Sequence, residues 1–222
     1  MYRYERKFIV KGVHTSEIEN LIYSNPYKFS EIYKKRSINN IYFDTIELKN
    51  FYDNINGSMD RTKVRIRWYN NLFGLIEKPK LEFKIKKGLS GTKKIYSIMP
   101  FENESSLSSS KIISVVCSSD LINEVKQKVF FLEPKIINKY DRKYFRSFDK
   151  KYRITLDTNQ KYCDFRGNKI LNKYENTCDL STIVELKYDI KDEENAHVIT
   201  NAFPFRITKS SKYVNAIENL FF

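Results

Sequence analysis

The stretch KVRIRWY, residues Lys63–Tyr69, has a cationic residue at every second position and apolar residues between them. Successive side chains of a β-strand point to opposite faces, so this segment predicts a strand with one basic and one apolar face. The basic face carries Lys63, Arg65 and Arg67. An open antiparallel sheet would leave that face in water, whereas a closed barrel could turn it inward and cover its apolar exterior with helices.

Period-two charge, combined with β-branched or aromatic residues, recurs along the whole chain. It predicts strands at Tyr2–Val10, Ile38–Asp44, Thr62–Tyr69, Lys80–Lys87, Lys93–Phe101, Lys135–Ser147, Lys151–Asn159 and Thr182–Ile190. Amphipathic patterns predict helices at Thr15–Ser24, Asp44–Asn54, Ser119–Leu132 and Ser210–Phe222. The serine-rich segment Glu102–Lys111 predicts a mobile loop. No repeat or domain boundary is visible, which indicates a single domain of residues 1–222.

The chain has 222 residues, a formal net charge of +13, and hydrophobic and aromatic fractions of 41% and 15%. These fractions allow a sizeable core. The charge suggests an anionic partner, such as nucleic acid, anionic lipid or a polyanionic small molecule, although abundant lysine alone also gives a solvated basic surface. Three cysteines without CxxC spacing fit reduced thiols rather than disulfides or a zinc site. Because no signal peptide or bilayer-length apolar run is visible, we expect a soluble cytoplasmic protein.

Acidic residues alternate with the cations of several predicted strands, which favours an inward-facing charged surface. The pairs are Glu5–Lys7, Glu82–Lys84 and Glu185–Lys187. Two like charges ~6 Å apart at an effective dielectric constant of about 20 repel by roughly 3 kcal/mol, so a ring of cations needs a multiply charged anion. Triphosphate or polyphosphate fits, since each oxygen accepts charge-assisted hydrogen bonds. The sequence therefore predicts an α+β fold, a closed eight-stranded antiparallel β-barrel with a polar, basic lumen and helices packed on its outside.

Eight segments in a fixed order carry a resemblance to a known family. They read RYERKF, NIYFDT, KVRIRWY, LEFKIKKG, YDRKYF, YRITLDTN, VELKY and SKY. Together they resemble the VTC (vacuolar transporter chaperone) domain, a polyphosphate polymerase domain of the triphosphate tunnel metalloenzyme superfamily, in its stand-alone bacterial form. The resemblance implies an eight-stranded tunnel in which Mn²⁺ or Mg²⁺ assists transfer of the γ-phosphate of ATP to inorganic polyphosphate. ATP and polyphosphate are then the expected partners, with no specific nucleic acid.

The resemblance also implies the site residues. The basic phosphate-binding residues of the family fall on Lys7, Arg65, Arg67, Lys84, Arg142, Arg153 and Lys212. Lys93 is a looser match, and Lys86 joins this set because it shares a strand face with Lys84. The metal-binding glutamate falls on Glu185, within VELKY. Glu5 stands where the superfamily has an acidic signature, but here the motif is ERK and not ExExK.

Three other functions remain open from the sequence. The same tunnel could admit water as the nucleophile and act as a triphosphatase or polyphosphatase. It could bind polyphosphate or inositol phosphates without catalysis. Net charge alone would also suit a nucleic-acid-binding protein, but the arginines alternate along strands and no RNA-binding signature is visible, which disfavours that function.

Overall fold

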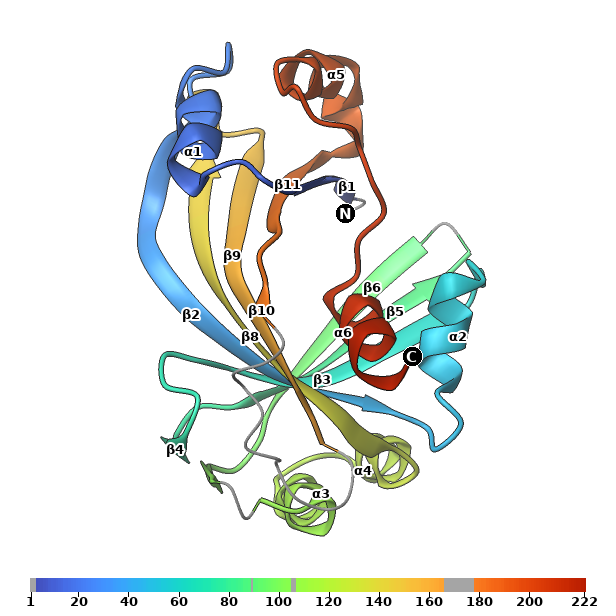
Figure 1. The fold of residues 1–222 in the computed structure, drawn as a ribbon. Coiled ribbons are helices and arrows are strands. Elements are labelled where there is room, and N and C mark those ends of the chain that lie inside the picture. Colours follow the sequence, from blue (N-terminus) through green and yellow to red (C-terminus); the bar gives the residue numbers. More distant parts are fainter. Residues whose placement is uncertain (1–2, 89, 105–106, 166–177) are drawn as a thin grey trace. The chain divides into compact units, whose positions relative to one another are not determined.

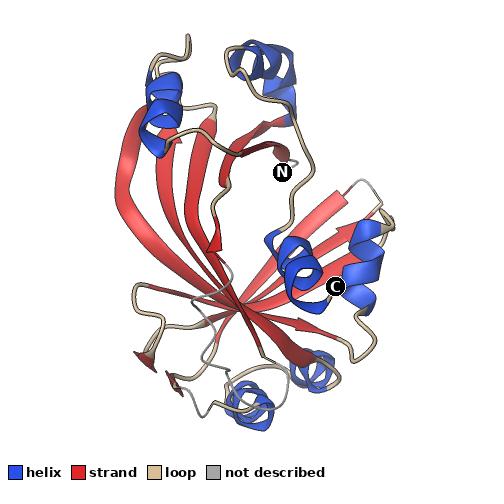
Figure 2. Ribbon diagram, viewed as in Figure 1, coloured by secondary structure: helices blue, strands red, loops and turns tan. Residues whose placement is uncertain are grey.

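The computed structural model describes residues 3–88, 90–104, 107–165 and 178–222 (Figure 1). Its strands are β1 Arg3–Val10, β2 Ser30–Asp44, β3 Arg61–Tyr69, β4 Gly74–Ile76, β5 Lys80–Lys87, β6 Ser90–Ser97, β7 Phe101–Asn103, β8 Glu133–Arg146, β9 Arg153–Asp164, β10 Cys178–Asp179 and β11 Thr182–Asp189. Its helices are α1 Thr15–Tyr23, α2 Lys49–Ile55, α3 Ser109–Ser118, α4 Asn123–Phe130, α5 Glu193–Asn201 and α6 Lys212–Phe221. The mixture of strands and helices confirms the predicted α+β class (Figure 2).

The main sheet has the hydrogen-bonded order β1-β11-β9-β8-β2-β3-β5-β6, and β10 pairs with β9 outside this path. The pairs β1–β11, β11–β9, β2–β3, β3–β5 and β5–β6 are antiparallel, as predicted. Strands β4 and β7 form a separate two-stranded sheet. The order has two terminal strands, β1 and β6, so the described strands form a sheet with ends. Closure of that sheet into a barrel therefore stays a prediction.

The chain folds as two compact units, which are described separately. Unit 1 comprises Met1–Arg36, Tyr140–Gln160 and Asp179–Ser210. Unit 2 comprises Ser37–Lys139, Lys161–Cys178 and Ser211–Phe222. The single domain of residues 1–222 stays a prediction.

Unit 1 builds its core from the apolar faces of β1, β9 and β11. In the β1–β11 register, Phe8 lies opposite Val184 and Lys7 opposite Glu185, so apolar and charged pairs alternate. Phe8 and Val184 are fully buried in a cluster that includes Ile18 of α1. The predicted period-two pattern is thus confirmed here, and it separates the core from the charged face.

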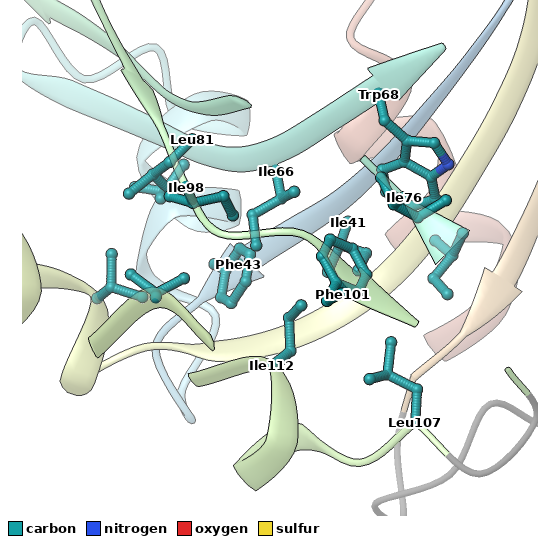
Figure 3. Close-up of a cluster of buried hydrophobic side chains, with 14 of the residues drawn as sticks. Ile41, Phe43, Ile66, Trp68, Ile76, Leu81, Ile98, Phe101, Leu107 and Ile112 are labelled. Carbon is teal, nitrogen blue, oxygen red and sulfur yellow. The ribbon is translucent and has the colours of Figure 1, made fainter. Parts of the chain in front are cut away.

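Unit 2 builds a larger core on the apolar face of β3 and β5. Trp68 is 2% exposed and contacts Phe101 edge-to-face at 5.9 Å between ring centroids (Figure 3). The same cluster contains Ile112 of α3 and Val125 of α4, together with Phe83 of β5. Trp68 and Phe83 therefore pack in a cluster with helical side chains, and Arg65 and Arg67 of β3 lie on the opposite face.

Several element boundaries differ from the predictions. Strand β2 begins at Ser30 rather than Ile38, and β9 continues to Asp164. The predicted strand Lys93–Phe101 is two strands in the structure. Strand β6 covers Ser90–Ser97 and β7 begins at Phe101, with residues outside regular structure between them. Of the predicted strand Tyr2–Val10, Tyr2 lies outside the described residues.

The serine-rich segment Glu102–Lys111 is not a loop throughout, contrary to the prediction. Residues 105–106 lie outside the described part, but Ser109 already begins α3. The side chain of Ser108 accepts a hydrogen bond from the backbone N–H of Lys111, which caps the helix. Serine is a favoured helix N-cap, so the composition that suggested a loop instead starts a helix.

Candidate functional site

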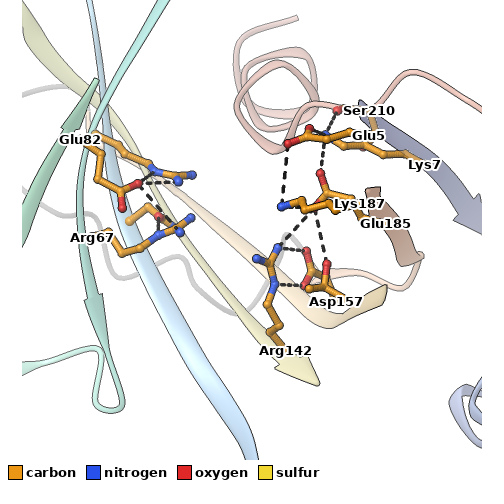
Figure 4. Close-up of polar contacts among 12 residues, drawn as sticks. Glu5, Lys7, Arg67, Glu82, Arg142, Asp157, Glu185, Lys187 and Ser210 are labelled. Atoms are coloured by element: carbon orange, nitrogen blue, oxygen red, sulfur yellow. Dashed lines mark hydrogen bonds and ion pairs between the residues drawn. The ribbon is translucent and has the colours of Figure 1, made fainter. Parts of the chain in front are cut away.

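A single buried carboxylate holds three cations on the charged face of unit 2. We call Arg65, Arg67, Glu82 and Lys93 the Glu82 cluster (Figure 4). Arg65 donates from Nε and Nη2 to Oε2 of Glu82 at 2.7 and 2.6 Å, and Lys93 Nζ donates to Oε1 at 2.6 Å. Arg67 Nη1 lies 3.9 Å from Oε2. Only 6% of the Glu82 side chain is exposed, so these charges interact with little solvent screening.

The pKa values of the Glu82 cluster reflect how closely its cations approach one carboxylate. Burial alone would raise the pKa of Glu82, but the charges of Arg65 and Arg67 and the hydrogen bond from Lys93 lower it to about 2. Burial lowers the pKa of Lys93, and Arg65 and Arg67 lower it further, against the raising effect of Glu82. One carboxylate thus serves three cations. Three cations gathered in this way are an arrangement that suits a polyanionic ligand.

The depressed pKa of Glu82 predicts an acid-sensitive unit 2. The pKa of Glu82 is about 2 in the folded protein, against an ordinary value of 4.5. The ionised carboxylate therefore stabilises the fold above pH 4.5, and this stabilisation is lost as the pH falls through 2. We expect a contribution on the order of 3 kcal/mol at neutral pH. The measurement is urea unfolding between pH 7 and pH 2, followed by the fluorescence of Trp68, the single tryptophan of the chain, which lies in unit 2.

The control for this prediction is Glu82→Gln, which removes the titrating group and keeps its size. The variant is expected to be less stable than the parent at neutral pH, with a shallower loss of stability on acidification. A variant with the same acid profile as the parent would assign the transition to other carboxyls.

Neighbouring polar groups hold the two arginines of the Glu82 cluster in place. Arg65 Nη1 donates to the hydroxyl of Tyr42 at 3.2 Å, and Arg67 Nε donates to Oδ1 of Asn40 at 2.9 Å. Asn40 in turn donates to Asn138 at 3.2 Å. Tyr42 and Asn40 lie opposite Arg65 and Arg67 in the β2–β3 register. Strand pairing therefore orients both guanidinium groups before any ligand binds.

Tyr42 also connects the cluster to helix α6. Its ring stacks on that of Tyr213 at 5.4 Å between centroids. The hydroxyl of Tyr213 donates to Oδ2 of Asp44, and burial and this carboxylate both raise the pKa of Tyr213. Asp44 is fully buried and also accepts the backbone N–H groups of Asn50 and Phe51 at the start of α2. Asp44 thus joins β2, α2 and α6 through charge-assisted hydrogen bonds.

The remaining predicted cations of unit 2 lie around this cluster. Lys84 pairs with Lys93 and with Lys63 in the strand registers, so it shares their face, and Lys86 lies opposite Arg61 towards the end of β5. Lys212 is the first residue of α6, directly after the N-cap Ser211. The hydroxyl of Ser211 accepts a hydrogen bond from Lys63 Nζ at 2.8 Å, which brings the start of α6 to the basic strand β3.

A second charged cluster lies in unit 1 and is balanced. It consists of Glu5, Lys7, Arg142, Asp157, Glu185 and Lys187, and we call it the Glu185 cluster (Figure 4). Lys7 Nζ lies 3.4 Å from Oε1 of Glu185, and Lys187 Nζ lies 3.3 Å from Oε2. Glu5 lies within ion-pair distance of both lysines, at 3.8 and 3.9 Å. Three cations face three carboxylates, in contrast to the Glu82 cluster.

Arg142 is fixed by a carboxylate that the sequence analysis did not assign to the site. Its Nε and Nη2 donate to the two oxygens of Asp157 at 2.5 and 2.7 Å, and Nη2 lies 3.9 Å from Oε2 of Glu185. Asp157 is fully buried. Burial alone would lower the pKa of Arg142, but the charge of Asp157 raises it well above its ordinary value. Asp157 therefore accepts hydrogen bonds from Nε and Nη2 of Arg142 but not from its Nη1.

Lys7 and Arg153 complete the predicted cations of unit 1. Burial alone would lower the pKa of Lys7, but the charges of Glu185 and Glu5 raise it, so the ammonium group stays protonated. Its Nζ also donates to the backbone carbonyl of Ser210 at 3.2 Å. Arg153 lies opposite Lys187 in the β9–β11 register and therefore shares its face.

A divalent cation is the cofactor that the resemblance implies, with Glu185 and Glu5 as its predicted ligands. Among the described residues, no three histidine, cysteine or carboxylate side chains converge in a way that could hold a metal ion. This donor set does not fit a cage built of protein alone. Mg²⁺, however, commonly uses one or two carboxylates and takes its other ligands from phosphates and water. Glu185 and Glu5 therefore fit a cation that arrives together with a phosphate ligand.

Comparison with known protein families identifies the chain. The model of the VTC domain family matches residues 2–221, nearly the whole sequence. This chain belongs to the VTC domain family. The family resemblance read from the eight sequence segments is thereby confirmed.

Solved structures with the fold of this VTC domain are distant in sequence. The PH1819 protein from Pyrococcus horikoshii OT3 has a TM-score of 0.52 and 11% identity, over 98% of this chain and 99% of that one. A "putative adenylate cyclase" from Vibrio parahaemolyticus has a TM-score of 0.51 and 12% identity, over 96% and 97%. No curated protein matches the chain. At these identities the likeness concerns the fold alone.

In the part of this VTC domain that the structure describes, no helix has the length and apolar character required to cross a bilayer. The longest helices, α3 and α6, have 10 residues each. A bilayer-spanning helix requires about 20 residues.

Several residues of the candidate site were not predicted from the sequence. Glu82 was placed on the charged face but given no role, and Asp157, Lys187, Tyr42 and Asn40 were not assigned to the site. Strand parity was the available signal, since Asp157 and Lys187 alternate in step with Arg153 and Glu185. Only the register, however, places Glu82 opposite Arg65 and Glu185 opposite Lys7.

Proposed function

We propose that this VTC domain is a metal-dependent phosphotransferase that binds the triphosphate of ATP and transfers the γ-phosphate to a growing inorganic polyphosphate chain. The observation that carries the proposal is the convergence of three cations, Arg65, Arg67 and Lys93, around the buried carboxylate of Glu82. A phosphate chain supplies several closely spaced acceptor oxygens, which suits guanidinium forks. The proposal includes the closed eight-stranded tunnel, and a cytoplasmic location where ATP is available.

In the proposed reaction, a terminal oxygen of the polyphosphate chain attacks the γ-phosphorus of ATP. A new phosphorus–oxygen bond forms, the bond from the γ-phosphorus to the β–γ bridging oxygen breaks, and ADP leaves. No covalent enzyme intermediate is required, because positioning and charge stabilisation supply the catalysis. A divalent cation, Mn²⁺ or Mg²⁺, held by Glu185 and Glu5 would supply neutralisation of phosphate charge.

The basic residues of unit 2 and those of unit 1 would each bind phosphate oxygens. Arg65 and Arg67 bind phosphate oxygens through their guanidinium forks, while Lys93, Lys84, Lys86 and Lys212 act as point charges. In unit 1, Lys7, Arg142 and Arg153 bind further phosphate oxygens. Asp157 orients Arg142 through the bidentate contact. Glu185, with Glu5, provides the carboxylate oxygens for a phosphate-borne cation.

The test is an assay of both products in one reaction. The purified chain is incubated with ATP and Mn²⁺, and long-chain polyphosphate and free phosphate are measured in parallel. We expect polyphosphate to accumulate, and one molecule of ADP to form for each phosphate unit added to the polymer. An Arg65→Ala preparation, purified in the same way, controls for contaminating kinases and phosphatases.

The same assay separates the alternative functions. Release of free phosphate without formation of polymer would show that the domain is a triphosphatase and not a polymerase. If neither product forms but inorganic triphosphate raises the melting temperature, the domain is a binding module, because a ligand that binds the native state stabilises it.

A further inference from the structure

An exposed aromatic and guanidinium cluster lies on strands β2 and β8 of unit 1, which are neighbours in the sheet. It consists of Tyr33, Arg36 and Tyr144. The guanidinium carbon of Arg36 lies 4.8 Å from the ring centroid of Tyr33 and 5.7 Å from that of Tyr144. The two rings meet edge-to-face at 5.7 Å. Tyr33 is 49% exposed and Arg36 is exposed, so part of this cluster is accessible to a ligand.

This cluster is continuous with the Glu185 cluster through one residue. The guanidinium carbon of Arg142 lies 6.0 Å from the ring centroid of Tyr144. Arg142 also binds Asp157 and lies 3.9 Å from Glu185. An exposed stacking surface therefore begins beside a cation proposed to bind phosphate. All these residues belong to unit 1.

A nucleoside triphosphate combines the two chemistries that this face offers. Its phosphates require cations, and its base presents a flat π face that stacks on tyrosine rings or on the plane of an arginine. Polyphosphate has no such group. We propose that Tyr33, Arg36 and Tyr144 form a stacking platform for the base of the nucleotide donor, and this inference rests on the proposed function.

The platform would distinguish the phosphate donor, ATP, from the acceptor, the polyphosphate chain. Because the base stacks only on the donor, the platform favours ATP over a polyphosphate end at the same phosphate positions. The contacts that define the cluster are those of aromatic rings and a guanidinium, and stacking on such groups tolerates different bases. ATP and GTP are therefore expected to bind with similar affinity.

The test compares a ligand that has a base with one that lacks it. Isothermal titration calorimetry measures the dissociation constants of the β,γ-imido analogue of ATP and of inorganic triphosphate, both with Mg²⁺. Tyr33→Ala is expected to weaken binding of the ATP analogue by about 5- to 30-fold and to leave triphosphate binding unchanged. Tyr33→Trp keeps or improves analogue binding, and a stacked base quenches the fluorescence of the added tryptophan, whereas triphosphate does not.

Tyr23→Ala is the matched control. Tyr23 is 46% exposed, lies in the same unit, and also makes one edge-to-face contact, with Phe145 at 5.6 Å. Tyr23→Ala is expected to bind both ligands as the parent does. Equal weakening by Tyr23→Ala and Tyr33→Ala would assign the effect to lost packing and overturn the platform.

The remaining outcomes distinguish failure of the platform from failure of the proposed function. If Tyr33→Ala binds both ligands as the parent does, or loses both equally, the platform is wrong and the phosphate site stands. If the parent chain binds neither ligand, the proposed function is wrong and the platform falls with it. Tighter, Tyr33-dependent binding of a single-stranded oligoadenylate than of the ATP analogue would assign the platform to nucleic acid instead.

Discussion

Arg65→Ala is expected to lower the rate of polyphosphate synthesis by roughly 10²–10³-fold, the loss typical of removing one preorganised charge donor from a transition state. Arg65 contributes a guanidinium fork that is already oriented by Glu82 and Tyr42. Its replacement removes that fork while Arg67 and Lys93 continue to neutralise Glu82, so unit 2 is expected to fold. The measurement is the initial rate of polymer formation from ATP and Mn²⁺, together with the melting temperature of the variant.

Two further variants sharpen this result. Arg65→Lys keeps the charge but loses the planar fork, so an intermediate rate is expected. Arg61→Ala removes an arginine of the same strand whose guanidinium contacts the backbone carbonyl of Ser58, and its rate is expected to stay close to that of the parent. If Arg65→Ala made polymer at the parent rate, the Glu82 cluster would not be part of the catalytic site.

Arg142→Ala is expected to cost unit 1 about 3–5 kcal/mol of folding stability, because it removes one partner of a buried ion pair. Asp157 is fully buried and would lose both donors of its bidentate contact. The measurement is urea unfolding followed by far-ultraviolet circular dichroism and by Trp68 fluorescence in the same samples. Since Trp68 lies in unit 2, an early transition seen by circular dichroism alone would report unit 1.

The double variant Arg142→Ala/Asp157→Asn tests the cause of this loss. Removing the charge of Asp157 is expected to restore part of the stability, since the uncompensated carboxylate is the main cost. Lys143→Ala is the matched control on the same strand. Its partner Glu19 is partly exposed, so a loss of less than about 1 kcal/mol is expected. If the double variant were no more stable than Arg142→Ala, lost packing would explain the effect.

The strands with strict alternation could be located from sequence. Strand β5 has the predicted bounds Lys80–Lys87, and β3 and β11 differ from the predictions by one residue. The first part of β2 was missed because residues 30–37 are mostly charged or polar, and most are exposed, so no apolar period marks them. Helix α5 was also missed. It buries only Ala196, Ile199 and Thr200, too few residues for a clear helical pattern.

The cations of the site could be predicted from strand parity and family resemblance, but their partners could not. Parity states which residues share a face, whereas the strand register states which of them meet. Parity placed Glu82 on the same face as Lys84, and the structure places its contacts at Arg65 and Lys93 on the flanking strands. Asp44 and Tyr213 are 169 positions apart, and no local pattern predicts their hydrogen bond.

The carboxylates of the two clusters act as internal counter-ions. Glu82 already accepts hydrogen bonds from Arg65 and Lys93, so an incoming anion competes with a tethered carboxylate for these two cations. Tethering gives that carboxylate a high effective concentration, which dissolved monoanions such as chloride cannot match. A ligand with several linked phosphates competes as a single molecule at several cations. If the proposed function holds, the fixed carboxylates would discriminate by charge density, with a chain of phosphates favoured over single small anions.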